Sequence, residues 1–183
     1  QLLTTYLILV NSIFFNEFLN TNLKILFFIF LLLGTSIINF TNFLDCLDGL
    51  ITSSFILIFA TISFDDINYI FLVASLLVFL LFNWSPAKLF MGDSGSTYIG
   101  AVFFYTLLQT NDLKVMLARL LLATPIYLDA LTCLIFRYKN KFNIFSAHRM
   151  HLAQRLYLAG WTHSKISFLY LILVFINSLI YLF

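Results

Sequence analysis

The chain consists mainly of continuous apolar runs separated by short polar segments. The runs lie at about residues 2–15, 23–40, 50–64, 67–82, 97–109, 113–136 and 166–183. Residues 71–82 read FLVASLLVFLLF and lack the period of two expected of a barrel strand. Several runs are shorter than the ~20 residues that cross a bilayer core, so polar flanks complete those crossings or the segments are re-entrant. The pattern predicts an all-α polytopic membrane protein, with about seven transmembrane helices in one membrane-embedded domain spanning residues 1–183.

Composition strengthens this prediction, because 62% of the residues are hydrophobic, only 10% are charged, and the mean hydropathy is +1.00. Water-soluble domains keep roughly 25% of their residues charged, so lipid is the expected solvent and a nucleic-acid partner is not expected. Cys46 and Cys133 lie far apart and form no CxxC pair. They favour two buried thiols over a disulfide framework or a zinc site.

The basic residues are distributed unevenly along the chain. If every run crosses the membrane once, the segments 41–49, 83–96 and 137–165 share one face, and the turn at residues 65–66 belongs to the other. The first face carries seven of the ten basic residues: Lys88, Arg137, Lys139, Lys141, Arg149, Arg155 and Lys165. The positive-inside tendency therefore predicts that this face is cytoplasmic and that the protein is a multi-pass protein of the cell membrane. Asp65 and Asp66 are interpreted as an ordinary exposed turn on the opposite face.

Residues 39–50 form the first polar motif, with Asn39, Asn42, Asp45 and Asp48 at every third position. Three residues turn a helix by ~300°, so this stripe drifts by ~60° per step and cannot stay on one face. We expect the helix to break near Gly49. Carboxylates three residues apart can bind a divalent metal, receive a proton or position sugar hydroxyls. The alternative is a solvated loop with a helix cap, although acidic residues beside lipid usually have a function.

Residues 83–97 form the second motif, a polar link before an apolar run. Gly92 and Gly95 allow turns that expose amide groups to a phosphate. Ser94 and Ser96 can cap the helix that follows, and Asp93 offers a hard oxygen ligand for Mg²⁺. A plain capped turn explains the glycines and serines, but it explains less well the combination of Lys88, Phe90 and Asp93.

The third motif lies in the segment 137–165, where His148, His151 and Arg155 have helical spacing i, i+3 and i+7. One helix face would then present two imidazoles and a guanidinium to a pyrophosphate or a lipid phosphate. A basic segment that binds anionic lipid headgroups is an alternative. The two histidines could also ligate zinc, but no convincing third ligand is nearby.

Asp129 lies within an apolar run, toward the end expected to be cytoplasmic. An ionisable residue at such a position usually faces the protein interior and has a partner. We expect that partner to be Arg137 or a member of one of the motifs.

Taken together, residues 42–50, 90–96 and 148–156 closely resemble the polyprenyl-phosphate N-acetylhexosamine-1-phosphate transferases of glycosyltransferase family 4. The family includes WecA and WbpL and, more distantly, MraY, and the resemblance runs from about residue 23 to the end. It implies a polytopic helical enzyme that uses Mg²⁺, with Mn²⁺ as an alternative. The enzyme would transfer a sugar-1-phosphate from a UDP-N-acetylhexosamine to a polyprenyl phosphate such as undecaprenyl phosphate and release UMP. A homodimer is compatible with this picture.

The resemblance also implies roles for individual residues, carried over by motif position. Asp93 resembles the Mg²⁺ ligand, and Phe90 resembles the ring that stacks on uracil. The expected catalytic residues are Asp45, Asp48, Asp93, His148 and His151. The expected substrate-binding residues are Asn42, Phe90, Lys88, Ser94, Arg149 and Arg155.

The chain departs from the family pattern in three places. Cys46 replaces a usual glycine, and Ala153 replaces a frequent tyrosine. The family's adjacent aspartates, which precede the region covered here, have no match on the expected cytoplasmic face. We therefore expect the chain to be truncated at its N-terminus, with part of the site upstream, and to be inactive alone.

The histidine motif and its continuation resemble WecA and WbpL more than MraY, which favours initiation of a lipid-linked glycan such as O-antigen. Two other functions stay open. An ion or substrate transporter would place its coupling residues near the membrane midplane. A polyprenyl-diphosphate phosphatase would release inorganic phosphate instead of UMP.

Overall fold

The computed structural model describes residues 1–12, 14, 24–143, 146 and 149–183, and this part of the chain contains helices and no strands. The helices are α1 (Leu2–Val10), α3 (Lys24–Leu44), α4 (Leu50–Ile62), α5 (Tyr69–Asn83), α6 (Gly92–Leu107), α7 (Leu113–Leu122), α8 (Thr124–Lys139), α9 (Leu152–Leu158) and α10 (His163–Leu182). The predicted all-α class is confirmed. The predicted break near Gly49 is also confirmed, because α3 ends at Leu44 and α4 begins at Leu50.

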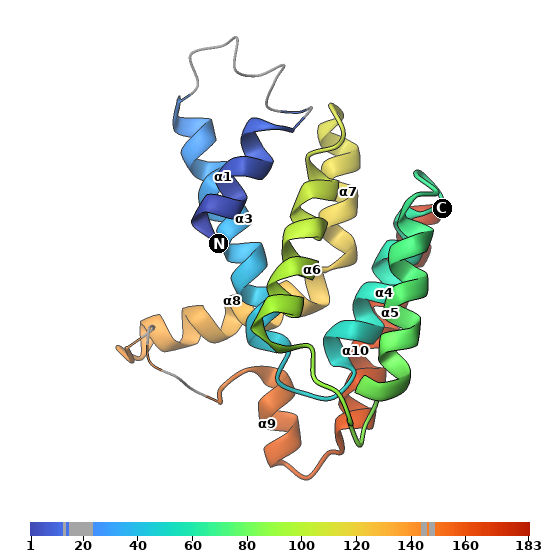
Figure 1. Cartoon of the computed structure of the whole chain (residues 1–183). Helices are drawn as coiled ribbons and strands as arrows, with labels where there is room; N and C mark the ends of the chain where they lie inside the picture. Colours follow the sequence, from blue (N-terminus) through green and yellow to red (C-terminus); the bar gives the residue numbers. More distant parts are fainter. Residues whose placement is uncertain (13, 15–23, 144–145, 147–148) are drawn as a thin grey trace.

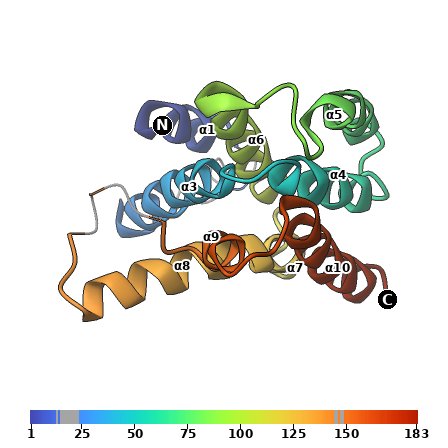
Figure 2. The ribbon, with the colours of Figure 1, turned by 90° about the horizontal axis from the view of Figure 1, so that it is seen from below.

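The helices form two groups joined by α10 and by the α3–α4 connection (Figures 1 and 2). In one group α3 packs extensively on α6, with α1 and α7 alongside. In the other, α4 packs on both α5 and α10. Helix α10 also contacts α7, α8 and α9. It is therefore the element that touches parts of both groups and the short helix α9.

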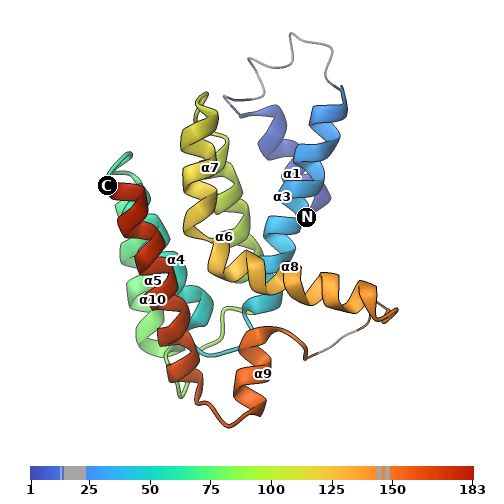
Figure 3. The ribbon, with the colours of Figure 1, turned by 180° about the vertical axis from the view of Figure 1, so that it is seen from behind.

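A sharp bend divides the apolar run at residues 113–136, which the sequence pattern treats as one crossing. Helices α7 and α8 meet at 77°, and α8 extends across the bundle (Figure 3). Pro125 in the first turn of α8 has no N–H to donate to the carbonyl of Leu121. That carbonyl instead accepts hydrogen bonds from Thr124 Oγ1 and Asn177 Nδ2, each at 2.8 Å. Side chains thus satisfy the backbone group that the proline leaves free, as an apolar environment requires.

Two described helices are long and apolar enough to cross a membrane, Ile25–Leu44 and His163–Leu182. The bent pair α7 and α8 adds a third if it is counted as one span. Helices α4 and α5 are apolar but shorter. Seven crossings therefore stay a prediction.

Large apolar side chains cover much of the outer surface. On α5, for example, Phe71 is 75% exposed and Leu81 is 78% exposed. Inside the bundle, hydroxyl groups donate to carbonyls of their own helices, as Thr41 Oγ1 does to Ile37 at 2.9 Å. An apolar exterior combined with internally satisfied polar groups is what a lipid environment demands.

Helices α3 and α6 approach each other closely at Gly100. A Cβ added at Gly100 would lie 2.9 Å from the backbone Cα of Ile38 and 3.1 Å from Thr41 Oγ1. The missing side chain lets the two helices approach closely, as small residues do in membrane bundles. This contact fixes the end of α3 relative to the start of α6, where the first two motifs lie.

Candidate functional site

All three motif segments lie at one end of the helices (Figures 1 and 3). They comprise the turn at residues 45–49, the loop at residues 84–91 and the stretch from residue 149 to 162, which contains α9. The predicted grouping of the motifs is therefore seen in the structure. The side of the membrane on which this end lies stays a prediction.

Asn42 connects the first motif to the second. Its Nδ2 donates to Asp93 Oδ1 at 3.1 Å and to Ser96 Oγ at 2.8 Å. Ser96 Oγ in turn donates to the carbonyl of Gly92 at 3.0 Å. Helix α6 begins at Gly92, so Ser94 and Ser96 lie inside its first turns, and the prediction that they cap it is wrong. Ser96 instead holds Asn42, which fixes one oxygen of Asp93.

A cavity of about 170 Å³ opens beside this cluster. Its lining residues come from the first two motifs: Asn42, Asp45, Cys46, Leu47, Asp48, Asn83, Phe90, Met91, Gly92 and Asp93. Burial, and then the nearby Asp93 carboxylate, raise the pKa of Asp45 to about 7. The cavity thus brings three carboxyl groups together, and no basic residue is among the described residues that line it. Of the predicted site residues, Lys88 and Ser94 are exposed and do not line it.

Asp48 is held from two directions. Its Oδ2 accepts from the backbone N–H of Ala87 at 3.2 Å. His163 Nδ1, at the start of α10, lies 3.1 Å from the same oxygen and accepts the Asp48 backbone N–H at 3.3 Å. Ser167 Oγ donates to the Asp48 carbonyl at 2.9 Å. Asp48 is therefore fixed by the second motif and by α10.

The loop at residues 84–91 is positioned by Asn83, which is buried at the end of α5. Asn83 Oδ1 accepts from Thr52 Oγ1 at 2.6 Å, and its Nδ2 donates to the Leu89 carbonyl at 3.0 Å. The amide of Lys88 also donates to the Phe82 carbonyl at 2.8 Å. These bonds present the ring of Phe90 at the rim of the cavity, where it is 71% exposed. An exposed aromatic ring at a cavity rim can stack on a planar base.

Asp129 is the buried anchor of the third motif. Its side chain is 2% exposed and accepts from the backbone N–H groups of Leu152 at 2.6 Å and Ala153 at 3.2 Å. The hydroxyl of Tyr170, on α10, donates to it at 2.6 Å. A carboxylate that binds the first amides of a helix acts as its N-terminal cap. Asp129 therefore caps the start of α9, together with Gln154, whose Oε1 accepts the His151 N–H at 3.4 Å.

Because α9 begins at Leu152, His151 and Arg155 do not share the predicted helix face. His151 precedes the helix and is buried, with its Nδ1 3.8 Å from Asp129 Oδ1 and its ring 6.4 Å from the ring of Phe43. Burial lowers the pKa of His151, and the Asp129 carboxylate opposes this shift. The neutral imidazole is thus favoured, and positive charge here comes from arginine. His148 lies outside the described residues.

Arg149 and Arg155 line a second cavity, of about 660 Å³, between α8 and the third motif. The remaining lining residues are Asp129, Thr132, Cys133, Phe136, Met150 and Leu152. The surface is largely apolar and carries two guanidinium groups. It has the chemistry needed to bind an apolar chain that ends in a phosphate.

Asp129 is predicted from the sequence to pair with Arg137 or with a member of one of the motifs, and the structure shows the second of these. Asp129 pairs with the third motif through Leu152 and Ala153. Arg137 instead donates to the carbonyl of Asn143 and to Ser146 Oγ, the latter at 2.9 Å. Arg137 therefore shapes the loop after α8.

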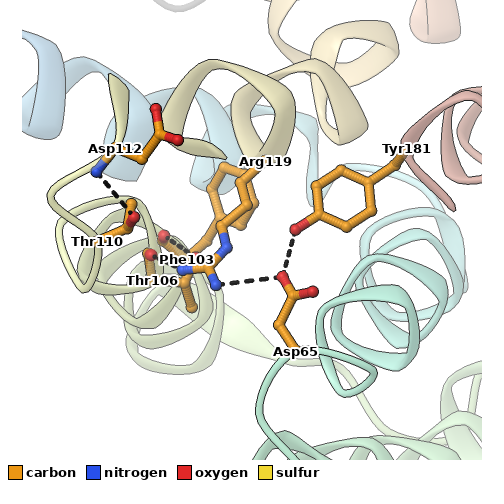
Figure 4. A network of polar contacts seen from close by, with 7 residues as sticks. All are labelled: Asp65, Phe103, Thr106, Thr110, Asp112, Arg119 and Tyr181. Atoms are coloured by element: carbon orange, nitrogen blue, oxygen red, sulfur yellow. Dashed lines mark hydrogen bonds and ion pairs between the residues drawn. The ribbon is translucent and has the colours of Figure 1, made fainter. Parts of the chain in front are cut away.

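At the opposite end, Asp65 lies in an exposed turn, as predicted, but its carboxylate also joins a network of polar contacts with the buried Arg119 (Figure 4). Its Oδ2 accepts from Arg119 Nη2 at 3.2 Å and from the hydroxyl of Tyr181. Arg119 Nη1 donates to the Thr106 carbonyl at 2.7 Å. Asp66 only binds Asn68, two residues later, as a turn residue does. The network ties α6, α7 and α10 to the α4–α5 turn.

Three residues of α10 contact the motifs; sequence reasoning places His163 in the third motif segment and the other two only in an apolar run. His163 and Ser167 hold Asp48, and Tyr170 holds Asp129. Their spacing of i, i+4 and i+7 is the one signal that could have shown a shared helix face.

Comparison with known proteins identifies the family. The model of "Glycosyl transferase family 4" matches residues 2–111. The chain belongs to this family. The resemblance seen in the sequence is thereby confirmed, and the match covers the first two motifs and the cavity between them.

Relatives of two kinds match the chain. A phospho-N-acetylmuramoyl-pentapeptide-transferase of Fervidobacterium nodosum is 35% identical, over 77% of this chain and 48% of that protein. A probable undecaprenyl-phosphate N-acetylglucosaminyl 1-phosphate transferase of Bacillus subtilis is 30% identical, over 69% and 39%. A decaprenyl-phosphate N-acetylglucosaminephosphotransferase of Mycobacterium leprae is 31% identical, over 74% and 42%. The chain thus spans about half the length of the curated relatives that it matches.

Proposed function

We propose that the parent protein transfers an N-acetylhexosamine-1-phosphate from a UDP-sugar to a polyprenyl phosphate and releases UMP, and that this chain supplies most of the site. The names of the relatives describe transferases of this kind, acting on N-acetylglucosaminyl phosphate or phospho-N-acetylmuramoyl-pentapeptide. The observation that carries the proposal is the acidic cavity at Asp93, which lies at the same end of the helices as the arginine-lined cavity at α9.

Mg²⁺ is the proposed cofactor, with Mn²⁺ as an alternative, and Asp93 is its proposed ligand. Among the residues that the structure describes, no three His, Cys, Asp or Glu side chains are grouped to hold a metal. Mg²⁺ does not require such a group, because one or two carboxylates and substrate phosphates usually bind it. Burial, and then repulsion from Asp93, raise the pKa of Asp45, and a cation at Asp93 would offset the repulsion. When bound, the ion supplies positive charge to the phosphates.

In the proposed reaction, an oxygen of the polyprenyl phosphate attacks the sugar-bearing phosphorus of the UDP-sugar. A new P–O bond forms, the P–O bond to UMP breaks, and UMP leaves with the electron pair. Two anions must approach each other, so positioning and charge neutralisation dominate catalysis. Arg149 and Arg155 bind the lipid phosphate, while Asp45 and Asp48 form the wall that orients the nucleotide sugar. Phe90 stacks on the uracil.

The resemblance of the third motif to WecA and WbpL supports a lipid-linked glycan such as O-antigen as the product, whereas the phospho-N-acetylmuramoyl-pentapeptide-transferases among the relatives support a peptidoglycan precursor. The clustering of basic residues supports a cytoplasmic site in a multi-pass membrane protein. The part of the site that precedes this chain is proposed to contain the family's paired aspartates, so we expect activity only in the parent protein. A homodimer stays a prediction.

The test uses membranes that contain the full-length protein, with undecaprenyl phosphate, Mg²⁺ and a panel of UDP-N-acetylhexosamines. We expect UMP release with at least one sugar, its abolition by a chelator, and a loss of at least about 100-fold in Asp93→Asn, as removal of a key electrostatic group produces. Asp66→Asn is the matched control, because it removes a carboxylate at the opposite end and should retain wild-type activity. No UMP release with any sugar would refute the proposal. Release of inorganic phosphate from polyprenyl diphosphate would favour the phosphatase, and solute uptake without UMP release would favour a transporter.

A further inference from the structure

One face of α10 contacts both parts of the candidate site. His163, Ser167 and Tyr170 are spaced i, i+4 and i+7, so they lie along one side of the helix. Ser167 and Tyr170 are buried, as is Ile166 beside them, and His163 is partly buried. The polar groups of this face therefore point into the protein and not toward lipid.

The first turns of α10 hold the backbone and side chain of Asp48. His163 Nδ1 accepts the Asp48 N–H at 3.3 Å and lies 3.1 Å from its Oδ2. Ser167 Oγ donates to the Asp48 carbonyl at 2.9 Å. A neutral imidazole can accept from the amide and a protonated one can donate to the carboxylate, so His163 binds Asp48 in both states. Asp48 directly precedes Gly49, which has a φ of 72°, so its backbone lies in a turn without helical hydrogen bonds to fix it.

Two turns along the same face, Tyr170 holds the third motif through Asp129. Its hydroxyl donates to Asp129 Oδ2 at 2.6 Å, and the same oxygen accepts the Ala153 N–H at 3.2 Å. The other oxygen of Asp129 accepts the Leu152 N–H at 2.6 Å. The hydroxyl thus orients the carboxylate that caps α9, the helix that carries Arg155.

We infer that α10 is the positioning element of the site. It holds Asp48, which is proposed to orient the nucleotide sugar, at a fixed position relative to α9, which carries Arg155 and is proposed to bind the lipid phosphate. His163, Ser167 and Tyr170 are positioning residues, because each acts through Asp48 or Asp129. The ligands assigned to the two segments are taken from the proposed function, so this part of the inference rests on it. The geometric part of the inference, that one helix orders both segments, stands independently of the reaction.

The variants are His163→Ala, His163→Asn and Tyr170→Phe in the full-length protein in nanodiscs. Asparagine places an amide group near the position of Nδ1, so His163→Asn should restore the contact with Asp48. Tyr181→Phe is the matched control for Tyr170→Phe, because it removes a hydroxyl from the same helix at the opposite end of the molecule.

Hydrogen exchange tests the geometry without relying on activity. Loss of one hydrogen bond should speed exchange of the dependent amides about fivefold. We expect faster exchange at Leu152 and Ala153 in Tyr170→Phe, and at Asp48 in His163→Ala. His163→Asn should restore protection, and Tyr181→Phe should leave both segments unchanged. Unchanged exchange at both segments would overturn the inference, even if the protein transfers no sugar phosphate.

Steady-state kinetics then test which substrate's binding depends on each of the two contacts. We expect His163→Ala to raise KM for the UDP-sugar and Tyr170→Phe to raise KM for the polyprenyl phosphate, each about fivefold or more. A purely structural role would instead lower the amount of active enzyme and leave both KM values unchanged, and that result would also overturn the inference. If the wild-type enzyme releases no UMP, the proposed function fails while the exchange experiment still decides the geometric part.

Discussion

The network at Asp65 gives a stability prediction that can be worked out from its exposure. Asp65→Asn removes the charge that faces Arg119, whose side chain is 9% exposed, whereas that of Asp65 is 38% exposed. Breaking a fully buried ion pair costs about 3–5 kcal/mol, and breaking an exposed one costs about 0.2–1 kcal/mol. With one partner buried and the other partly solvated, we expect a loss of about 2 kcal/mol. In a chain of about 150–250 residues this would correspond to a fall in Tm of about 4–8 °C, and in the longer parent protein the fall should be about half as large.

The assay is thermal unfolding of the full-length protein in detergent, followed by tryptophan fluorescence, with Asp66→Asn as control. The Asp66 carboxylate accepts from the backbone and side chain of Asn68 within its own turn, so its substitution should change stability by less than about 0.5 kcal/mol. The double variant Asp65→Asn/Arg119→Met should be more stable than the sum of the single effects predicts, because it also removes the buried charge. Equal Tm values for Asp65→Asn and Asp66→Asn, or strict additivity in the double variant, would refute the reasoning.

Three further substitutions test other parts of the structure. Gly49→Ala should destabilise the protein by about 1–2 kcal/mol in thermal unfolding, because φ is 72° and the new Cβ would lie 2.8 Å from the Trp84 ring. Gly100→Leu should lower Tm more than Gly49→Ala does, since the backbone of Ile38 lies 2.9 Å from the new Cβ and cannot move aside locally. Arg155→Gln should raise KM for the polyprenyl phosphate about tenfold in the UMP-release assay, as loss of a charged hydrogen bond does, and leave KM for the UDP-sugar unchanged.

For each of these three substitutions, a specific result would contradict the prediction. Wild-type stability in Gly49→Ala would show that the turn adopts another conformation. A stable Gly100→Leu variant would show that α3 and α6 are farther apart than in the structure. A higher KM for the UDP-sugar in Arg155→Gln would assign the second cavity to the nucleotide sugar.

The sequence predicts the helical class and the grouping of motifs because both depend on local pattern. Continuous apolar runs require helices, and the drift of the stripe from Asn39 to Asp48 requires a break, which occurs at residues 45–49. The alternation of connections between two faces is enough to bring the loop at residues 84–91 and α9 to the same end. These predictions need no knowledge of which helices touch.

The sequence does not predict features that depend on contacts between distant segments. The start of α9 is set by Asp129, 23 residues before Leu152, so helical spacing alone misplaces His151. Asp65 looks like a solvated turn until Arg119 and Tyr181 are seen to reach it from α7 and α10. The bend before Pro125 is signalled by the proline, but the hydrogen bond from Asn177 to the Leu121 carbonyl, 56 residues away in the sequence, is not.

Helix α10 is attached near both of its ends, at His163 to the turn after α3 and at Tyr181 to the α4–α5 turn. An insertion or deletion of a single residue between these attachments would rotate one end relative to the other by about 100° and shift it by about 1.5 Å. Tyr181 would then face away from Asp65 whenever His163 faces Asp48. The number of residues in this segment is therefore constrained as strictly as their identity, and length changes should be tolerated only beyond Tyr181 or in steps that restore whole turns.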